Sequence, residues 1–334
     1  MIIKIGLEIF GSSDENVLSN LTSIFRILFK SDCEHMWDAS NVDTDAIESI
    51  KKEEWFTKYL SITEQELFER LLKKEEITSV KEFYFSSFFV EDAQQLESLI
   101  QILSEVSYVI LENGTNDWKF VKGIVFMYSK VKRNERKILY RKLKRCIETN
   151  QLRSDNAGGT GQIINRIKEK EAIFGSAYIK YRVATIFDND KTKVTDKISN
   201  SHKKIISYIK GKSVSSSSTL KFEDTDLIPW HMLYKREIEN YLPLYFILNY
   251  FPLHDVDEIK GFSNEEYDFI KIEDYFSDYG TKNDFPPLFL KNELKRARLE
   301  ERCEHHKIRI DTVGYKSEEI TEMELLLVRL ARII

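Results

Sequence analysis

Between residues 106 and 245, short apolar runs alternate with longer segments of helical spacing. Residues 106–111 (VSYVIL) and 179–187 (IKYRVATIF) are rich in β-branched and aromatic side chains, which is typical of buried strands. Apolar residues recur at helical spacing over residues 118–144, 162–173 and 195–209. This alternation favours an α/β fold with a mainly parallel sheet and helices on both of its faces.

The N-terminal flank has a mixed pattern. We predict a strand over Ile2–Phe10, because this segment is rich in β-branched residues, and a helix that follows the Ser12–Asp14 cap and runs to Leu28. Glu66–Lys74 has helical spacing, and Thr78–Val90 is aromatic and β-prone. Residues 1–105 are therefore predicted to form an α+β region.

The C-terminal flank is predicted to be mostly helical, with a break at Pro286–Pro287. Its clearest helices are expected over Leu294–Glu304 and Glu318–Ile333. The pattern as a whole predicts three regions, with boundaries at 1–105, 106–245 and 246–334.

Composition narrows the function classes. The 334 residues include 50 Lys and Arg against 55 Asp and Glu, for a net charge of −5 at pH 7. A chain with this balance is not a polycationic nucleic-acid coat, so any contact with nucleic acid has to be local. The sequence has no apolar run of the ~18 residues that a membrane span needs, and its three cysteines are far apart, which argues against a disulfide framework. We therefore expect a cytoplasmic protein.

Acidic residues follow both predicted strands of the central region. Glu112 comes directly after the first strand, and Gly114 then permits a tight turn into the next helix. Asp188 and Asp190 come directly after the second strand, and two residues with this spacing point the same way in an extended segment. One such acid is usually a loop or capping residue. Carboxylates gathered at one sheet edge repel one another unless a hard cation such as Mg²⁺ lies between them.

This order of motifs resembles the TOPRIM domain of topoisomerases, bacterial primases and OLD-type (overcoming lysogenization defect) nucleases. The resemblance covers residues 106–245 and implies a Rossmann-like core. Two further segments resemble phage-defence members of the family: a glycine turn over Asp155–Ile163 and a Glu-containing segment, KREIENYL, over Lys235–Leu242, which is expected to be helical. Many members carry a second acid four residues after the first Glu, whereas here the nearest is Asp117, five residues on.

The resemblance implies a nuclease that hydrolyses phosphodiester bonds, of DNA more readily than RNA, with Mg²⁺ or Mn²⁺. Two metal ions in such a site activate a water molecule and stabilise the leaving oxygen. The implied metal ligands are Glu112, Asp117, Asp188, Asp190 and Glu239. Glu112 is alternatively a general acid–base.

Three further residues have implied roles. On a helix, Glu237 and Glu239 point about 200° apart, so only one can face the site. Glu239 is favoured because it begins the best-matching part of the segment, and Glu237 is the other candidate. Lys191 or Lys235 would stabilise the charge that develops on the phosphate, with a solvated surface position as the alternative for both.

OLD-type nucleases commonly work with an ABC-type ATPase. This sequence has no GxxxxGK[ST] motif, so the resemblance implies a separate ATPase or sensor as partner. The two flanking regions are natural docking surfaces for such a partner. Self-association into a homo-oligomer is a further alternative. The competing hypothesis is a TOPRIM-like regulatory or binding subunit with little or no nuclease activity.

Three weaker signals remain. Residues 130–145 hold nine Lys and Arg, which could contact DNA phosphates beside the carboxylates or form a solvated basic face. The amides of the Gly158–Gly161 turn could bind a phosphate, or the turn could be a simple connection. Cys303, His305 and His306 suggest zinc, but they lack a second cluster to complete four ligands.

Overall fold

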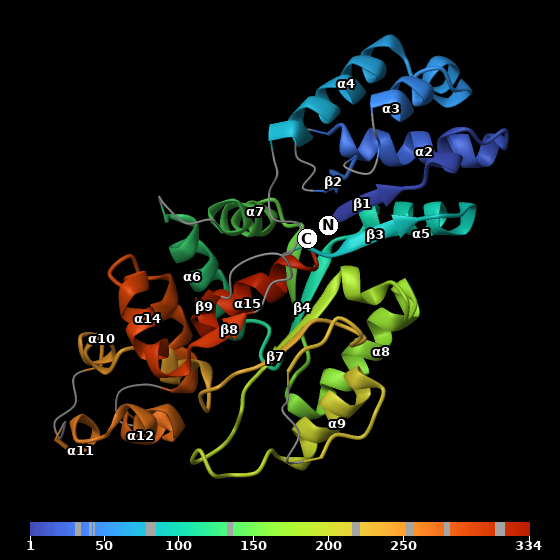
Figure 1. Ribbon diagram of the computed structural model, residues 1–334. Coiled ribbons are helices and arrows are strands. Elements are labelled where there is room, and N and C mark those ends of the chain that lie inside the picture. The colour runs from blue at the N-terminus through green and yellow to red at the C-terminus, as the bar shows by residue number, and fades with distance from the viewer. Residues whose placement is uncertain are drawn as a thin grey trace.

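The computed structural model describes residues 1–30, 35–39, 42, 44–77, 85–131, 136–215, 221–251, 257–276, 281–310 and 318–334. A four-stranded parallel sheet, ordered β5-β4-β6-β7, forms its centre (Figure 1). The strands are β4 (Ser107–Leu111), β5 (Leu152–Asn156), β6 (Val183–Phe187) and β7 (Trp230–Met232). Along β4, Val109 and Leu111 enter one hydrophobic core and Ile110 enters the other, so the strand is buried on both faces.

Helices cover both faces of this sheet. One face packs against α8 (Ile163–Phe174) and α9 (Asn200–Lys210). The other face packs against α6 (Asp117–Ser129), α7 (Lys137–Glu148) and α15 (Glu322–Ala331). The predicted α/β class, with a parallel sheet flanked by helices as in Rossmann-like cores, is confirmed.

The N-terminal region has a sheet and a core of its own. Its sheet is parallel, in the order β2-β1-β3, with strands β1 (Ile2–Ile5), β2 (Met36–Trp37) and β3 (Ser87–Val90). The helices are α1 (Leu7–Phe10), α2 (Glu15–Leu28), α3 (Thr44–Ile50), α4 (Ile62–Ile77), α5 (Ala93–Ser104) and the π-helix Trp55–Tyr59. The ring of Phe25 lies 4.8 Å from that of Trp55 and 5.2 Å from that of Trp37, so aromatic packing fills this core.

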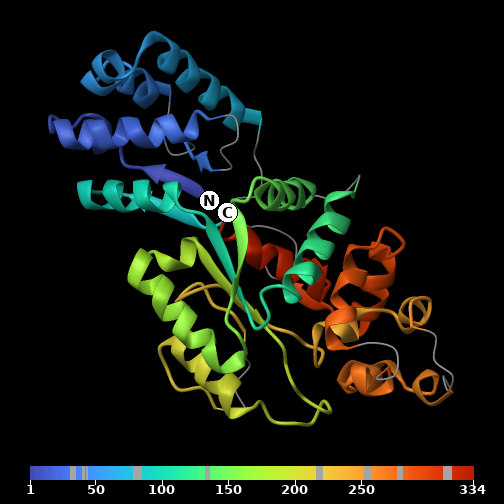
Figure 2. The same ribbon diagram turned by 180° about the vertical axis from the view of Figure 1, so that it is seen from behind.

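The C-terminal region does not form a separate core. Its short helices share one hydrophobic cluster with α6, α7 and the central sheet. They are α10 (Leu244–Leu248), α11 (Asp257–Lys260), α12 (Asn264–Phe269), α13 (Ile272–Tyr275), α14 (Arg296–Cys303) and the 3₁₀ turns η5 (Ile238–Tyr241), η6 (Lys282–Asp284), η7 (Pro286–Leu290) and η8 (Glu304–His306). An antiparallel pair, β8 (Ile308–Ile310) and β9 (Glu318–Ile320), precedes α15. From behind, these helices lie at the opposite end of the molecule from the N-terminal region (Figure 2).

Several predicted elements have different bounds. The strand predicted over Ile2–Phe10 ends at Ile5, because Gly6 begins the one-turn helix α1. Helix α9 begins only at Asn200, where the Ser199 side chain accepts a hydrogen bond from the His202 amide. Segment 318–333 divides at Thr321, which caps α15. Within the predicted β-prone segment 78–90, residues 78–84 lie outside the described residues.

In the described segments, no helix combines the length and the apolar character needed to cross a bilayer.

The contact between α6 and η7 fixes the C-terminal region against the sheet, and it depends on Gly123. A methyl group at Gly123 would lie 2.5 Å from the carbonyl oxygen and 2.7 Å from the Cβ of Phe289. We predict that Gly123→Ala lowers the free energy of unfolding in urea by about 1–3 kcal/mol, although alanine is the better helix former by ~1 kcal/mol.

Gly161→Ala is the control, because its methyl group would meet no atom within 4 Å; its stability should change by less than ~0.5 kcal/mol. A Gly123→Ala variant as stable as the wild type would show that α6 and η7 can separate without cost.

Candidate metal centre

The turn after β4 aims Glu112 at the carboxyl edge of the sheet. The Asn113 side chain accepts from the amides of Thr115 and Asn116 at 3.3 and 3.2 Å. The Gly114 amide donates to Asn156 Oδ1 at 3.0 Å, and a Cβ at Gly114 would lie 2.7 Å from the Asn156 Cβ. The tight turn predicted at Gly114 is therefore present, and the close approach of β5 leaves no room for a side chain.

The glycine turn before α8 holds Glu112 and does not present its first amides to a ligand. Gly158 and Gly159, with φ of +77° and +117°, donate their amides to the Glu112 carbonyl oxygen at 3.1 and 3.0 Å. Thr160 Oγ1 donates to Glu112 Oε2 at 2.5 Å. The suggested phosphate cradle is therefore wrong for these two amides, which already have an acceptor. The turn positions a carboxylate.

Glu112 meets the loop after β6, as its place at the end of a neighbouring strand predicts. The Asp188 amide donates to Glu112 Oε1 at 3.1 Å. Asp190, however, has a φ of +58°, so this loop is a turn and not the extended segment that was expected. The amides of Asn189 and Asp190 donate to the Arg236 carbonyl oxygen at 3.0 and 3.1 Å, which joins the turn to the segment after β7.

The segment after β7 is not the predicted helix. Glu237 is extended, with φ −143° and ψ 168°, and caps the single turn of η5. Ligand oxygens of Asp188, Asp190 and Glu237 lie within 4.8 Å of one another. The preference for Glu239 over Glu237 in this group is therefore not supported, and the helical argument that only one of them faces the site does not apply.

Glu239 lies behind this group and is almost fully buried, at 2% exposure. Neither of its carboxylate oxygens has a hydrogen-bond partner among the described residues. Burial of such a group is costly unless a cation compensates it. A carboxyl group in this position either keeps its proton or has a cation bound beside it.

One positive charge comes from a lysine that the sequence patterns did not identify. Lys282, on η6, places Nζ 3.1 Å from Glu237 Oε1 and 3.8 Å from Asp188 Oδ2. Burial raises the pKa of Glu239 and of Asp117, and the positive charge of Lys282 opposes part of that increase. Nothing near Lys282 in the sequence marks it, because the docking of the C-terminal region brings it here.

Burial dominates the acid–base properties of the cluster. It raises the pKa of Asp188 well above its ordinary value, and the neighbouring charge of Glu112 adds to this increase. Burial also raises the pKa of Glu112, of Asp117 to about 6 and of Glu239 to about 8. A divalent cation between these oxygens would displace the protons, and carboxylate oxygens are the ligands that Mg²⁺ and Mn²⁺ prefer.

The remaining predicted residues differ in their relation to the cluster. Asp117 begins α6, accepts from the Asn113 amide at 2.8 Å and adds to the field that raises the pKa of Glu112. Lys235 is fully buried and pairs with Asp268 instead, and burial lowers its pKa. Lys191 is partly exposed, and no ion pair between described residues joins it to the carboxylates.

His202 is a neighbour that the sequence analysis did not select. Its Nε2 lies 3.6 Å from Asp190 Oδ2, its ring stacks on Phe187, and Ser199 bonds to Nδ1 at 2.8 Å. Burial lowers the pKa of His202, so a neutral imidazole borders the site.

The basic stretch does not border the carboxylates. Helix α7 ends at Glu148, just before β5 begins, and the Ser107 amide donates to the Gln151 carbonyl oxygen. This end of α7 therefore lies at the amino edge of the sheet, opposite Glu112 (Figure 1). Two of the nine basic residues, Arg136 and Lys142, are buried, and residues 132–135 lie outside the described residues. The suggested contact of this basic stretch with DNA phosphates beside the carboxylates is therefore wrong for α7.

Comparisons with protein-family models, with curated proteins and with solved structures find no match for this chain. The class that the fold and site define is an α/β protein with a partly buried carboxylate cluster at the carboxyl edge of a parallel sheet.

We predict that Glu239 makes the metal-free protein less stable as the pH rises. Its folded pKa of about 8 lies above its ordinary value of 4.5, so the folded state binds this proton more tightly than the unfolded state. The contribution of this proton to the free energy of unfolding is fully present below pH 4.5 and is lost as the pH rises towards 8. Glu239→Gln should therefore be more stable than the wild type at pH 8 by roughly 2–4 kcal/mol, with a gap that closes near pH 5.

Urea unfolding with a chelator present, at several pH values, measures this gap. Glu97→Gln, at an exposed position of α5, is the control and should show no gap that depends on pH. A constant difference between Glu239→Gln and the wild type would contradict the assignment.

Proposed function

We propose that this chain is a TOPRIM nuclease of the OLD-like, phage-defence type, which hydrolyses phosphodiester bonds with Mg²⁺ or Mn²⁺. The buried, unpartnered carboxylate of Glu239 beside the Asp188–Asp190–Glu237 group carries the proposal. The order of motifs, strand–Glu–Asn–Gly and strand–Asp–x–Asp, supports the family, because both acids follow neighbouring parallel strands.

Asp188, Asp190 and Glu237 would hold the metal, and Glu112, Asp117 and Glu239 would complete its surroundings. The metal supplies a more acidic bound water and stabilises charge on the phosphate. Glu112 is positioned by Thr160 and the Asp188 amide, and its raised pKa suits a group that exchanges a proton near neutral pH. Lys282, half-exposed beside the carboxylates, replaces Lys191 and Lys235 as the cation that would bind a phosphate oxygen.

The substrate in this proposal is DNA in preference to RNA, and the chain works with a separate ATPase or sensor. The absence of an ATP-binding motif from the sequence supports this division of labour. Since α7 does not border the site, substrate contacts would come from the loops at the carboxyl edge. Lys282 would contact the substrate directly, and Asp190 would contact it through the bound metal.

A regulatory subunit is the second candidate, and one observation favours it. Lys282 already forms ion pairs with Glu237 and Asp188, which partly neutralises the cluster without a metal. In a protein that only binds a partner, this pairing would be enough to stabilise the carboxylates without a metal.

Plasmid cleavage distinguishes the two candidates. With Mg²⁺ or Mn²⁺, and with the partner ATPase where one is encoded beside this chain, the wild type should cut DNA. Asp188→Asn should reduce cutting to background because it removes a metal ligand. Lys282→Ala should lower the rate roughly 10²–10³-fold, and Glu97→Gln should cut like the wild type. Cutting that is absent, or equal in wild type and Asp188→Asn, would exclude the nuclease.

Mn²⁺ calorimetry tests the site independently of cutting. We expect Asp188→Asn to abolish binding and Glu112→Gln to weaken it by roughly 10–100-fold. Mn²⁺ binding without cleavage would favour the regulatory subunit, whereas equal binding by wild type and Asp188→Asn would contradict the metal centre itself.

A further inference from the structure

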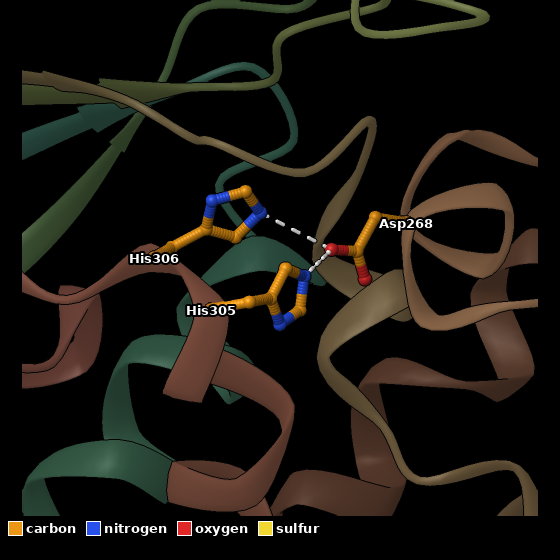
Figure 3. Close-up of side chains that lie close together, drawn as sticks. All are labelled: Asp268, His305 and His306. Carbon is orange, nitrogen blue, oxygen red and sulfur yellow. Dashed lines mark hydrogen bonds and ion pairs between the residues drawn. The ribbon is translucent and has the colours of Figure 1, made fainter.

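A second group of metal-ligand atoms lies on the C-terminal side of the molecule. Figure 3 shows His305 and His306, from η8, turned toward the same oxygen of Asp268, from α12. The His305 Nε2 lies 2.6 Å and the His306 Nε2 3.2 Å from Asp268 Oδ2. All three ligand atoms are within 4.8 Å of one another.

The carboxylate in this group is fixed from behind. Asp268 is fully buried, and its other oxygen, Oδ1, accepts from Lys235 Nζ and Arg302 Nη2. The Asp268 backbone carbonyl also accepts from the Arg236 amide at 2.8 Å. A ligating carboxylate whose second oxygen is held by hydrogen-bond donors is the arrangement that orients ligands in metal sites.

We propose that Asp268, His305 and His306 form a binding site for a zinc-type transition-metal ion. Zinc bonds of about 2.0–2.1 Å place tetrahedral ligand atoms about 3.3 Å apart. The separation between His306 Nε2 and Asp268 Oδ2 already matches this value. His305 Nε2 would have to move away from Asp268 Oδ2 by less than ~1 Å. The histidine side chains are 32% and 25% exposed, so an ion and a water ligand can enter from solvent.

The surrounding charges determine which ion fits. Lys235 and Arg302 carry two positive charges against the one negative charge of Asp268, so the site has no net negative charge to attract a cation. Mg²⁺ and Ca²⁺ depend on anionic oxygen ligands, whereas Zn²⁺ binds neutral imidazole nitrogens strongly. The site therefore selects zinc over the hard cations that suit the Asp188 cluster.

The sequence suggested a different set of ligands. Cys303, His305 and His306 stand together in the chain, but Cys303 is buried and is not one of the three converging residues. Asp268 supplies the missing ligand from another helix. A bound ion would thus join α12 to η8 and, through Lys235 and Arg236, to the segment that carries Glu237.

The test is a Zn²⁺ titration of the chelator-stripped full chain in excess Mg²⁺, with Co²⁺ absorption as a report on tetrahedral geometry. His305→Gln and His306→Gln are the variants, because glutamine still donates a hydrogen bond to Asp268 but is a poor zinc ligand. We expect one zinc ion to bind per wild-type chain. Each variant should bind zinc at least ~10-fold more weakly. Zn²⁺ should raise the melting temperature of the wild type alone.

Glu97→Gln, at an exposed position of α5 outside both metal-ligand groups, is the control and should bind Zn²⁺ like the wild type. Far-UV circular dichroism of each variant confirms that it is folded. The proposal is overturned if the wild type binds no zinc under these conditions, if both histidine variants bind as the wild type does, or if Glu97→Gln loses binding as they do. None of these outcomes depends on nuclease activity.

Discussion

The repulsion among buried carboxylates is the constraint around which this molecule is arranged. Parallel strands β4 and β6 bring Glu112 and Asp188 to the same sheet edge, and the turn after β7 adds Glu237 and Glu239. Placing so many acids out of water costs free energy that ordinary packing does not return. The structure limits this cost with specific donors: Thr160 and the Asp188 amide for Glu112, and Lys282 for Glu237. Among the described residues, Glu239 has no such donor.

The C-terminal region is part of this arrangement. It supplies Lys282 directly, and Asp268 holds the segment that carries Glu237 through the Arg236 amide and the Lys235 ammonium. Asn240 adds two hydrogen bonds to the carbonyls of Tyr267 and Ile270. The region therefore contributes to the geometry of the site.

The sequence was enough to predict contacts that follow from the order of the parallel strands. It was not enough to predict contacts that depend on how the C-terminal region packs against the sheet. Glu112 and Asp188 could be expected to meet, because acids that follow neighbouring parallel strands share an edge. Lys282 could not be placed, since its position depends on how η7 packs against Gly123. The KREIENYL segment has helical spacing, but its first part is held extended, because the Arg236 carbonyl accepts from the amides of Asn189 and Asp190 and the Arg236 amide donates to the Asp268 carbonyl. Strand β5, with the polar sequence LRSDN, is defined by its partner β4 and carries no apolar pattern of its own.

Lys282 follows all four strands of the central sheet in the chain, and this order has a consequence for synthesis. The ribosome releases all four strands of the central sheet before η6 and η7 emerge, so the carboxylate edge can form while its lysine is still absent. A chain in which η6 has not yet docked would hold these acids without their internal counter-ion, and the docking of η6 would be the event that first brings the full set of charges together. Assembly of the site therefore depends on residues that follow the sheet in the chain.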